Sequence, residues 1–316
     1  MFFTNTQTRK FGASGYSGAL LLGLIVVLSI LYGSIQMKPK EIYADARQYV
    51  YAALSLHQTG TLSFEGKEPG YYREPLPSLF LSWHFKLFTD ITKETTFDEI
   101  VKSERLTSQI TKINLLYLAV ILLLISFLAK LITHSTPVII FSVILTSAYC
   151  VNWAEFLNAA LSESVSTMFL VANTVAFVLL YQKRSIPAAI LTGLSLGLLS
   201  LSKAIAFHVG IVGIPVAIAA LYCWRLASPR RALVLFLWVS LSFSATVVPW
   251  MVRNAVYCDN FTIADRGAHV LWTRVTKDKM TDEEYKGSFY VYSYGPLRKV
   301  VGALTGYSPG DMQRGG

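Results

Sequence analysis

Charged residues are scarce in this chain. They make up 15% of its 316 residues, whereas soluble domains usually carry about 25%. The first apolar run, residues 11–37, contains no charged residue at all. It exceeds the roughly 20 residues that cross a hydrocarbon core, and it is too long for the apolar region of a signal peptide. These features exclude an ordinary soluble domain and predict a membrane protein with an uncleaved first span.

Cysteine is also rare, and internal repeats are missing from the sequence. The three cysteines, Cys150, Cys223 and Cys258, lack the spacing of a metal site. Cys150 and Cys258 are expected near one membrane face, where an oxidising compartment would allow a disulfide. Packing of two free thiols in apolar surroundings is the other interpretation. Transporters often contain inverted repeats and interrupted helices, and the sequence shows neither.

Apolar sequence, in contrast, is abundant. Six apolar segments follow the first one, at residues 113–131, 138–151, 164–181, 186–201, 207–224 and 233–250. Helices are the only open-ended structures that satisfy backbone polar groups in lipid. The sequence therefore predicts an all-α polytopic membrane protein with a bundle of about seven transmembrane helices.

Asp and Glu are absent from the segments that would connect these spans on the side of the N-terminus. Those segments contain eight basic residues, namely Arg9, Lys10, Lys130, Lys183, Arg184, Arg225, Arg230 and Arg231. The long loop on the other side, residues 38–112, contains ten basic and ten acidic residues. Because basic residues concentrate on the cytoplasmic side of membrane proteins, we expect a cytoplasmic N-terminus. This topology explains most of the net charge of +9 without a nucleic-acid partner.

The predicted topology divides the chain into five segments. They are a cytoplasmic N-terminus (1–15), a first transmembrane helix (16–37), an extracytoplasmic loop (38–112), six further transmembrane helices (113–250) and an extracytoplasmic tail (251–316). The tail ends in SPGDMQRGG, which is typical of disorder. Residues 44–60 of the loop have a helical pattern that stops at Gly60, and PLPSLFLSWHFKLF is an amphipathic segment suited to the membrane interface. Such a long loop is usually functional, although a surface cap on the bundle is the alternative.

Ionisable side chains at the ends of spans are costly and indicate function by default. Glu163 opens the fourth span, where interaction with the helix dipole is the purely structural explanation. Lys203 interrupts apolar sequence at the outer end of the fifth span, so we expect an anionic group of a ligand or of the protein beside it. Arg253 follows Trp250 after the seventh span and has the alternative role of an interfacial anchor. Glu155, on a short outer connection, is otherwise an ordinary loop charge.

These groups share one predicted membrane face with Asp45, directly after the first span, and with Arg73 in the long loop. Carboxylates and cations would therefore meet at the outer end of an apolar bundle. That combination suits a substrate with an anionic head and an apolar tail.

The order of these motifs resembles the GT-C glycosyltransferases, in particular relatives of the protein O-mannosyltransferases and of the lipid A aminoarabinose transferase. An outward Asp, YYREPLPSLFLSWHFKLF, SES opening a span, LSK closing one and PWMVRN after another follow in sequence between residues 18 and 272. Each motif alone is weak, and the resemblance rests on their order and common sidedness.

The resemblance implies a polyprenyl-phosphate sugar donor and an inverting transfer to a hydroxyl of a lipid, glycan or protein acceptor, outside the cytoplasm at a bacterial inner membrane. Asp45 matches the catalytic acidic residue of the first loop and would act as general base, while Glu163 matches the acidic position opening the fourth span. The basic positions that would contact the donor phosphate are Arg73, Lys203 and Arg253. Further candidates for substrate contacts are Tyr49, Tyr72, Glu155 and Trp272. A divalent metal, Mg or Mn, held by Asp45 and Glu163 is an alternative way to stabilise the phosphate.

Two features depart from the GT-C pattern. Members usually continue into more spans and often into a soluble domain, whereas this chain stops soon after the seventh span, as expected for a truncated product or a short variant. The acidic pair of some relatives also lacks a counterpart, because Ala44 precedes Asp45. A transporter or flippase for an amphipathic or lipid-linked anion, and an inactive partner-binding fragment, are therefore the alternative functions.

Overall fold

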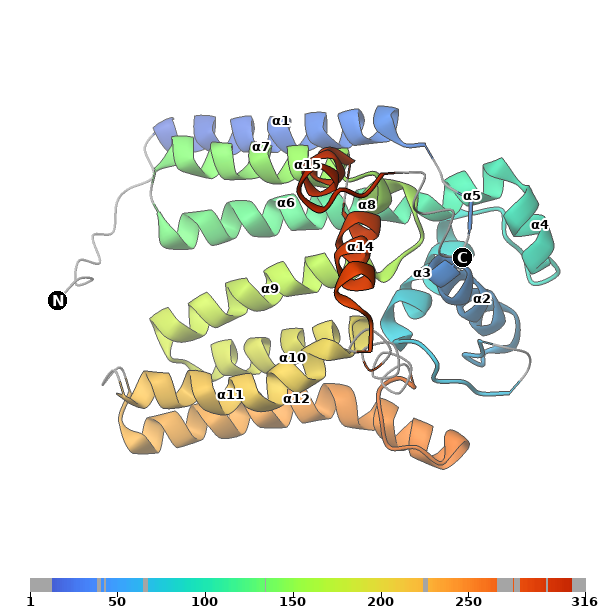
Figure 1. The fold of residues 1–316 in the computed structure, drawn as a ribbon. Helices are drawn as coiled ribbons and strands as arrows, with labels where there is room; N and C mark the ends of the chain where they lie inside the picture. Colours follow the sequence, from blue (N-terminus) through green and yellow to red (C-terminus); the bar gives the residue numbers. More distant parts are fainter. Residues whose placement is uncertain are drawn as a thin grey trace. The chain divides into compact units, whose positions relative to one another are not determined.

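The computed structural model describes residues 13–38, 41–42, 44–64, 68–133, 135–223, 227–265, 275, 279–293 and 295–308. The chain forms two compact units, Met1–Ala264 and Asp265–Gly316. Throughout the described ranges the regular secondary structure is helical, with no strand (Figure 1). The predicted all-α class is confirmed.

Apolar helices dominate the first unit. They are α1 (Ala13–Gln36), α6 (Ile113–Ile132), α7 (Thr136–Asn152), α9 (Ser162–Lys183), α10 (Ile186–Ser202), α11 (Ile205–Cys223) and α12 (Pro229–Cys258). Four helical stretches are long and apolar enough to cross a membrane, namely Glu104–Ile132, Ser162–Lys183, Ile205–Cys223 and Pro229–Cys258. Leu20–Gln36, Thr136–Asn152 and Ile186–Ser202 are shorter apolar helices. Several long apolar helices are what a multi-pass membrane protein requires, and the number of seven spans stays a prediction.

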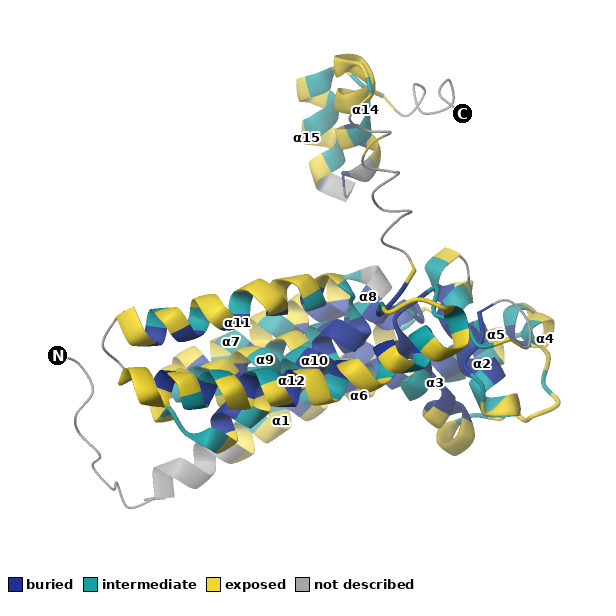
Figure 2. Ribbon diagram, turned by 90° about the horizontal axis from the view of Figure 1, so that it is seen from below, coloured by how far each residue is buried: buried dark blue, intermediate teal, exposed yellow. Residues whose placement is uncertain are grey.

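The apolar helices lie side by side in Figure 1, with the chain running back and forth between two ends of the bundle. α6 packs between α7 and α9, and α10 packs against α9, α11 and α12. Many large apolar side chains on the outside are exposed, including those of Leu28, Leu123 and Leu241. Figure 2 shows exposed positions in yellow along the outer helices of the bundle. Such an apolar exterior is suited to lipid rather than to water.

Two glycines let α10 approach α12 closely. A Cβ at Gly193 would overlap Ser242 Oγ and the backbone oxygen of Val239, and a Cβ at Gly197 would lie 2.6 Å from the Cβ of Thr246. Small residues four positions apart are typical of close helix packing in membranes, where van der Waals contact replaces the hydrophobic effect. This contact fixes the two helices relative to each other.

Helix α12 extends past the predicted span of residues 233–250. Ser228 caps its start by accepting a hydrogen bond from the backbone N–H of Arg231, and Pro229 occupies the first turn, where its missing N–H has no cost. The helix ends at Cys258 before Asp259, whose φ of 52° lies in the left-handed region. Residues 251–258, expected in the tail, are therefore helical.

The loop between α1 and α6 forms a helical cap at one end of the bundle (Figure 1). It contains α2 (Ala44–Thr59), α3 (Pro75–Phe88), α4 (Phe97–Lys102) and α5 (Glu104–Thr111), and the short α8 (Ala154–Asn158) lies between α7 and α9. The predicted helix stop at Gly60 is confirmed, because α2 ends at Thr59 and Gly60 has a φ of 74°. α3 buries Phe85 but also Ser78, and it exposes Leu87. Its predicted amphipathic character and its place at the membrane interface stay predictions.

The second unit contains α14 (Asp282–Tyr292) and α15 (Gly295–Thr305). Thr281 and Glu284 form a capping box at the start of α14, which satisfies backbone N–H groups there. The rings of Tyr290 and Tyr307 stack with centroids 6.4 Å apart. The tail, predicted to be partly disordered, thus contains two helices. Its last predicted disordered residues, 309–316, lie outside the described part of the chain.

Candidate functional site

Five predicted site residues lie at the same end of the first unit. Asp45 is in the first turn of α2, Arg73 precedes α3, Glu163 is in the first turn of α9, Lys203 follows α10 and Arg253 is near the end of α12. Hydrogen bonds connect these elements, as described below. Two other candidates are not placed in the site. Glu155 is a residue of α8, and Trp272 is outside the described residues.

The first polar group is centred on Arg73. Its guanidinium donates to Asp45 Oδ1 and to Gln48 Oε1, and it lies over the rings of Tyr49 and Tyr72, 5.5 and 5.7 Å from their centroids. The Arg73 side chain is 2% exposed, whereas that of Asp45 is 41% exposed. Arg73 therefore orients a carboxylate that solvent or a substrate can still reach.

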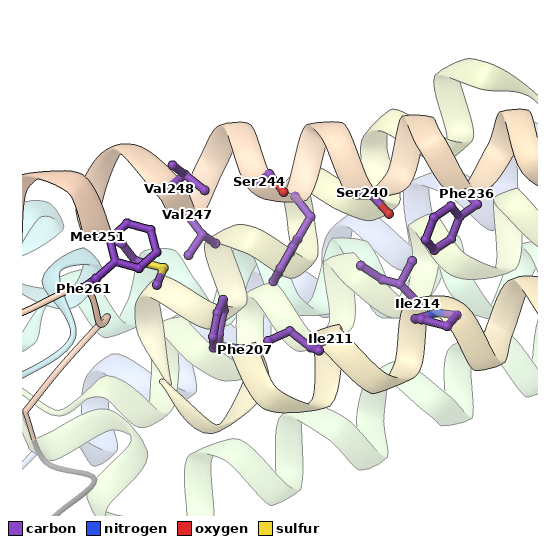
Figure 3. A pocket seen from close by; sticks show the side chains of 12 residues that line it. Phe207, Ile211, Ile214, Phe236, Ser240, Ser244, Val247, Val248, Met251 and Phe261 are labelled. Carbon is purple, nitrogen blue, oxygen red and sulfur yellow. The ribbon is translucent and has the colours of Figure 1, made fainter.

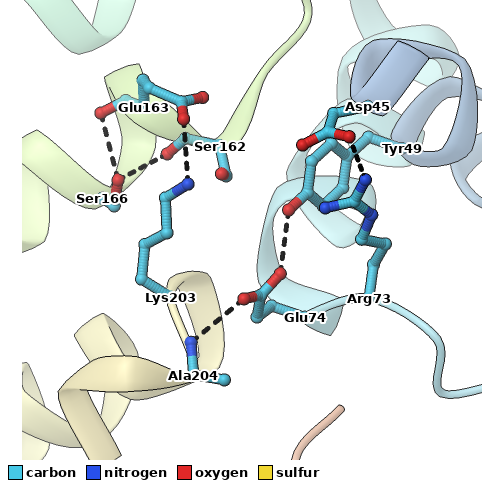
Figure 4. Close-up of polar contacts among 9 residues, drawn as sticks. All are labelled: Asp45, Tyr49, Arg73, Glu74, Ser162, Glu163, Ser166, Lys203 and Ala204. Carbon is cyan, nitrogen blue, oxygen red and sulfur yellow. Dashed lines mark hydrogen bonds and ion pairs between the residues drawn. The ribbon is translucent and has the colours of Figure 1, made fainter. Parts of the chain in front are cut away.

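Tyr49 and Glu74 form a second, buried contact directly beside the first. The Tyr49 hydroxyl donates to Glu74 Oε2 at 2.8 Å, and the backbone N–H of Ala204 donates to Glu74 Oε1 at 3.1 Å (Figure 4). Burial, together with the nearby Glu74 carboxylate, raises the pKa of Tyr49 far above its usual value, against the opposing effects of Ser162 and Arg73. Tyr49 is accordingly a hydrogen-bond donor at neutral pH.

The third group is the pair of Lys203 and Glu163. Lys203 Nζ lies 2.9 Å from Glu163 Oε1, and the two side chains are 35% and 31% exposed. The anionic group expected beside Lys203 is thus a carboxylate of the protein itself. Figure 4 shows this pair facing the group of Asp45, Tyr49, Arg73 and Glu74.

Two atoms in these groups are buried without a hydrogen-bond partner among the described residues. They are Arg73 Nη1, a donor, and Glu163 Oε2, an acceptor. Buried polar atoms are nearly always paired in folded proteins, so each exception asks for an explanation. Both atoms belong to residues that the sequence predicts as site residues.

Arg253 makes contacts of a different kind. Its guanidinium donates to the backbone oxygens of Gly70, at 2.8 Å, and Leu62, at 3.2 Å. It also lies over the Trp250 ring, 4.6 Å from the centroid. The structure therefore gives Arg253 an anchoring function for the loop between α2 and α3, and its predicted contact with a donor phosphate stays a prediction.

The described residues hold no group of three or more His, Cys, Asp or Glu that could bind a metal ion. Asp45 and Glu163, the predicted metal ligands, each pair with a basic side chain instead. The possible disulfide is also not formed, since Cys150 is a buried free thiol and Cys258 donates from Sγ to the backbone oxygen of Pro69 at 3.4 Å. The sequence could not exclude that pairing because it does not give the distance between the two cysteines.

An apolar cavity of about 290 Å³ lies between α11 and α12 (Figure 3). Its lining extends along α12 from Phe236 to Met251, which at 1.5 Å per residue is about 22 Å. Phe207, near the start of α11, and Phe261, after α12, line the end closest to the polar groups. Phe207 is four residues after Lys203 in the sequence, across the turn between α10 and α11, so this end of the cavity lies close to the turn that carries Lys203.

Glu74 is the main residue that the sequence analysis did not identify. It lies in the quoted segment YYREPLPSLF, and the available signal was an acidic residue directly before the proline that begins α3. Its two partners are 25 and 130 residues away along the chain, and a single sequence does not reveal such pairings.

Comparison with known proteins gives no relatives for this chain. No protein-family model, no curated protein and no solved structure matches it.

Proposed function

We propose that this chain is a membrane glycosyltransferase that transfers a sugar from a polyprenyl-phosphate-linked donor to a hydroxyl acceptor on the extracytoplasmic side. The observation that supports this most directly is the juxtaposition of acids and bases at the end of the bundle where the apolar cavity begins. A lipid-linked phosphate needs both features, a cation for its head and an apolar groove for its chain.

In the proposed reaction Asp45 is the general base. Its carboxylate takes the proton of the acceptor hydroxyl while the hydroxyl oxygen attacks the anomeric carbon of the donor sugar. The bond between that carbon and the phosphate oxygen breaks, and its electron pair remains on the polyprenyl phosphate. A single displacement of this kind inverts the anomeric configuration.

The remaining polar side chains assist this step. Arg73 holds the Asp45 carboxylate in place. Lys203 stabilises the negative charge that develops on the departing phosphate, and Glu163 keeps the Lys203 ammonium oriented before the donor arrives. Because Asp45 and Glu163 are each paired with a cation, no step is assigned to a metal.

Transport of an amphipathic anion is the competing function. It would favour ionisable side chains along the translocation path, near the middle of the bilayer. In the described parts of α6, α9, α10 and α12, the Asp, Glu, Lys and Arg residues lie near the helix ends. Their placement supports chemistry at the membrane surface.

The test is an assay of the purified full chain with a radiolabelled polyprenyl-phosphate sugar and a membrane extract as the source of acceptors. We expect a labelled product from the wild-type chain and none from Asp45→Asn, with both variants binding donor equally. Flux of label across proteoliposomes without product would indicate a transporter. Neither product nor flux would indicate a partner-binding fragment. Product formation by Asp45→Asn at the wild-type rate would remove Asp45 from its proposed role.

A further inference from the structure

Glu74, which belongs to neither helix, forms a hydrogen bond with the turn between α10 and α11. Lys203 directly follows α10, with its backbone N–H bonded to the oxygen of Leu199 at 2.8 Å, and α11 begins at Ile205. The N–H groups at the start of a helix lack partners within that helix. Glu74 Oε1 accepts the N–H of Ala204 at 3.1 Å, although the two residues are 130 positions apart. Glu74 therefore caps the start of α11, although it comes from a distant segment of the chain.

Glu74 is itself fixed by Tyr49. The hydroxyl of Tyr49 donates to its other carboxylate oxygen at 2.8 Å, and Ser78 Oγ donates to the Tyr49 backbone oxygen at 3.1 Å. Tyr49 and Glu74 are both buried. The hydrogen bonds thus form a continuous path from α2, which carries Asp45, through Glu74 to the residue that follows Lys203.

We propose that Glu74, held by Tyr49, is a positioning residue that fixes Lys203 relative to Asp45. The sequence neighbour of Glu74 supports this reading, because Arg73 binds Asp45 while Glu74 binds the turn beside Lys203. One short segment thereby places both the carboxylate and the ammonium group. The importance of Lys203 for a donor phosphate rests on the proposed function, whereas its positioning by Glu74 does not.

The first experiment measures the geometry of Lys203 without any ligand. The purified full chain is treated with an acetylating reagent, and the acetylation rate of Lys203 is followed by mass spectrometry. Glu74→Ala removes the cap, and we expect Lys203 to be acetylated faster by on the order of tenfold, the equivalent of losing a buried hydrogen-bonded partner. Glu74→Gln should react like the wild type, because its amide can accept from Ala204 and donate to Tyr49.

A matched control separates positioning from general loss of stability. Asn173 donates to the Thr192 backbone oxygen and to Ser195 Oγ, both at 3.1 Å, between α9 and α10. Asn173→Ala breaks these interior hydrogen bonds but leaves Glu74 and its partners intact, so we expect Lys203 to react at the wild-type rate. Equal acceleration in Asn173→Ala and Glu74→Ala, or a wild-type rate in Glu74→Ala, would overturn the proposal.

If Glu74→Ala does not fold, the Tyr49→Phe variant tests the proposal instead. It removes one hydroxyl and leaves Glu74 Oε2 without its partner, and we expect faster acetylation of Lys203 than in the wild type. An unchanged rate would contradict the proposal. The second readout is binding of a polyprenyl phosphate, which Glu74→Ala should weaken by on the order of tenfold while Glu74→Gln restores it. If the wild-type chain does not bind this lipid, the proposed function fails and the acetylation result still stands.

Discussion

The ammonium nitrogen of Lys203 lies 2.9 Å from Glu163 Oε1, across 40 residues of sequence. The pair brings the end of α10 against the start of α9. Because both side chains are about one-third exposed, the ammonium group is accessible from outside the protein while Glu163 orients it.

Replacement of Lys203 is expected to weaken binding of the donor lipid. In the proposed function Lys203 donates a charge-assisted hydrogen bond to the phosphate. Lys203→Ala would remove it, and we expect the Kd of a polyprenyl phosphate to rise by about tenfold to a hundredfold. Isothermal titration of the purified chain measures this. Lys183→Ala, a change at the exposed end of α9, is the control and should leave the Kd unchanged. Equal affinity in the wild type and Lys203→Ala would contradict the phosphate assignment.

The glycine contact between α10 and α12 predicts a sharp difference between two Gly→Ala substitutions. Gly193→Ala places a Cβ against Ser242 Oγ and the backbone oxygen of Val239, so we expect a loss of about 1–3 kcal/mol in the free energy of unfolding. Gly213→Ala in α11 meets no atom within 4 Å and should be neutral or slightly stabilising. Unfolding by SDS in mixed micelles measures both. Similar stability of the two variants would show that α10 and α12 are not in close contact.

Arg253 is expected to protect the loop between α2 and α3 from proteolysis. Arg253→Ala removes the hydrogen bonds to the oxygens of Gly70 and Leu62, so the loop opens locally more often. We expect cleavage within residues 61–72 to accelerate by on the order of tenfold. Limited proteolysis followed by mass spectrometry measures the rate.

Arg231 supplies a matched control for Arg253. It also donates from its guanidinium to a backbone oxygen, that of Arg184, at 2.7 and 3.1 Å, but near the start of α12. Arg231→Ala should therefore leave cleavage of residues 61–72 at the wild-type rate. A wild-type cleavage rate in Arg253→Ala would remove the anchoring function.

His84 predicts how stability depends on pH. Its Nε2 lies 2.8 Å from the Gln109 backbone oxygen, and burial lowers the pKa of the ring below its usual value of about 6.5. The folded state thus binds the proton less readily than the unfolded state. Stability is complete above about pH 6.5 and declines as the pH falls through the lower pKa of the folded state.

The measurement for His84 is the Tm of the purified chain between pH 8 and pH 5.5. The wild-type Tm should fall over this range, and His84→Gln, which does not titrate there, should show a smaller fall. Identical pH profiles for the two proteins would rule out His84 as the source.

The features that could be predicted from the sequence are those that depend on neighbouring residues. The stop of α2 at Gly60 follows from a local pattern, and the structure confirms it. Helix α12 continues past the predicted end of the span at residue 250, through the polar residues Arg253 and Asn254. Their partners come from elsewhere, since Asn254 Nδ2 donates to the Thr262 backbone oxygen and Arg253 to residues nearly 200 positions earlier. A hydropathy profile does not detect these hydrogen bonds between distant residues.

The same limit applies to the candidate site. Residue types and their predicted sidedness singled out Asp45, Arg73, Glu163 and Lys203, and the structure brings these residues to one end of the bundle. Sequence did not show that they pair as two ion pairs, because pairing depends on how α2, α3, α9 and α10 pack. Glu74 escaped notice for the same reason.

The atoms Arg73 Nη1 and Glu163 Oε2, which lack a hydrogen-bond partner among the described residues, carry an energetic cost. A buried donor or acceptor without a partner costs about 1–3 kcal/mol, and this cost lasts as long as the atom stays unsatisfied. Any local rearrangement that gives Arg73 Nη1 an acceptor and Glu163 Oε2 a donor would remove this cost. The two side chains therefore favour such a rearrangement energetically.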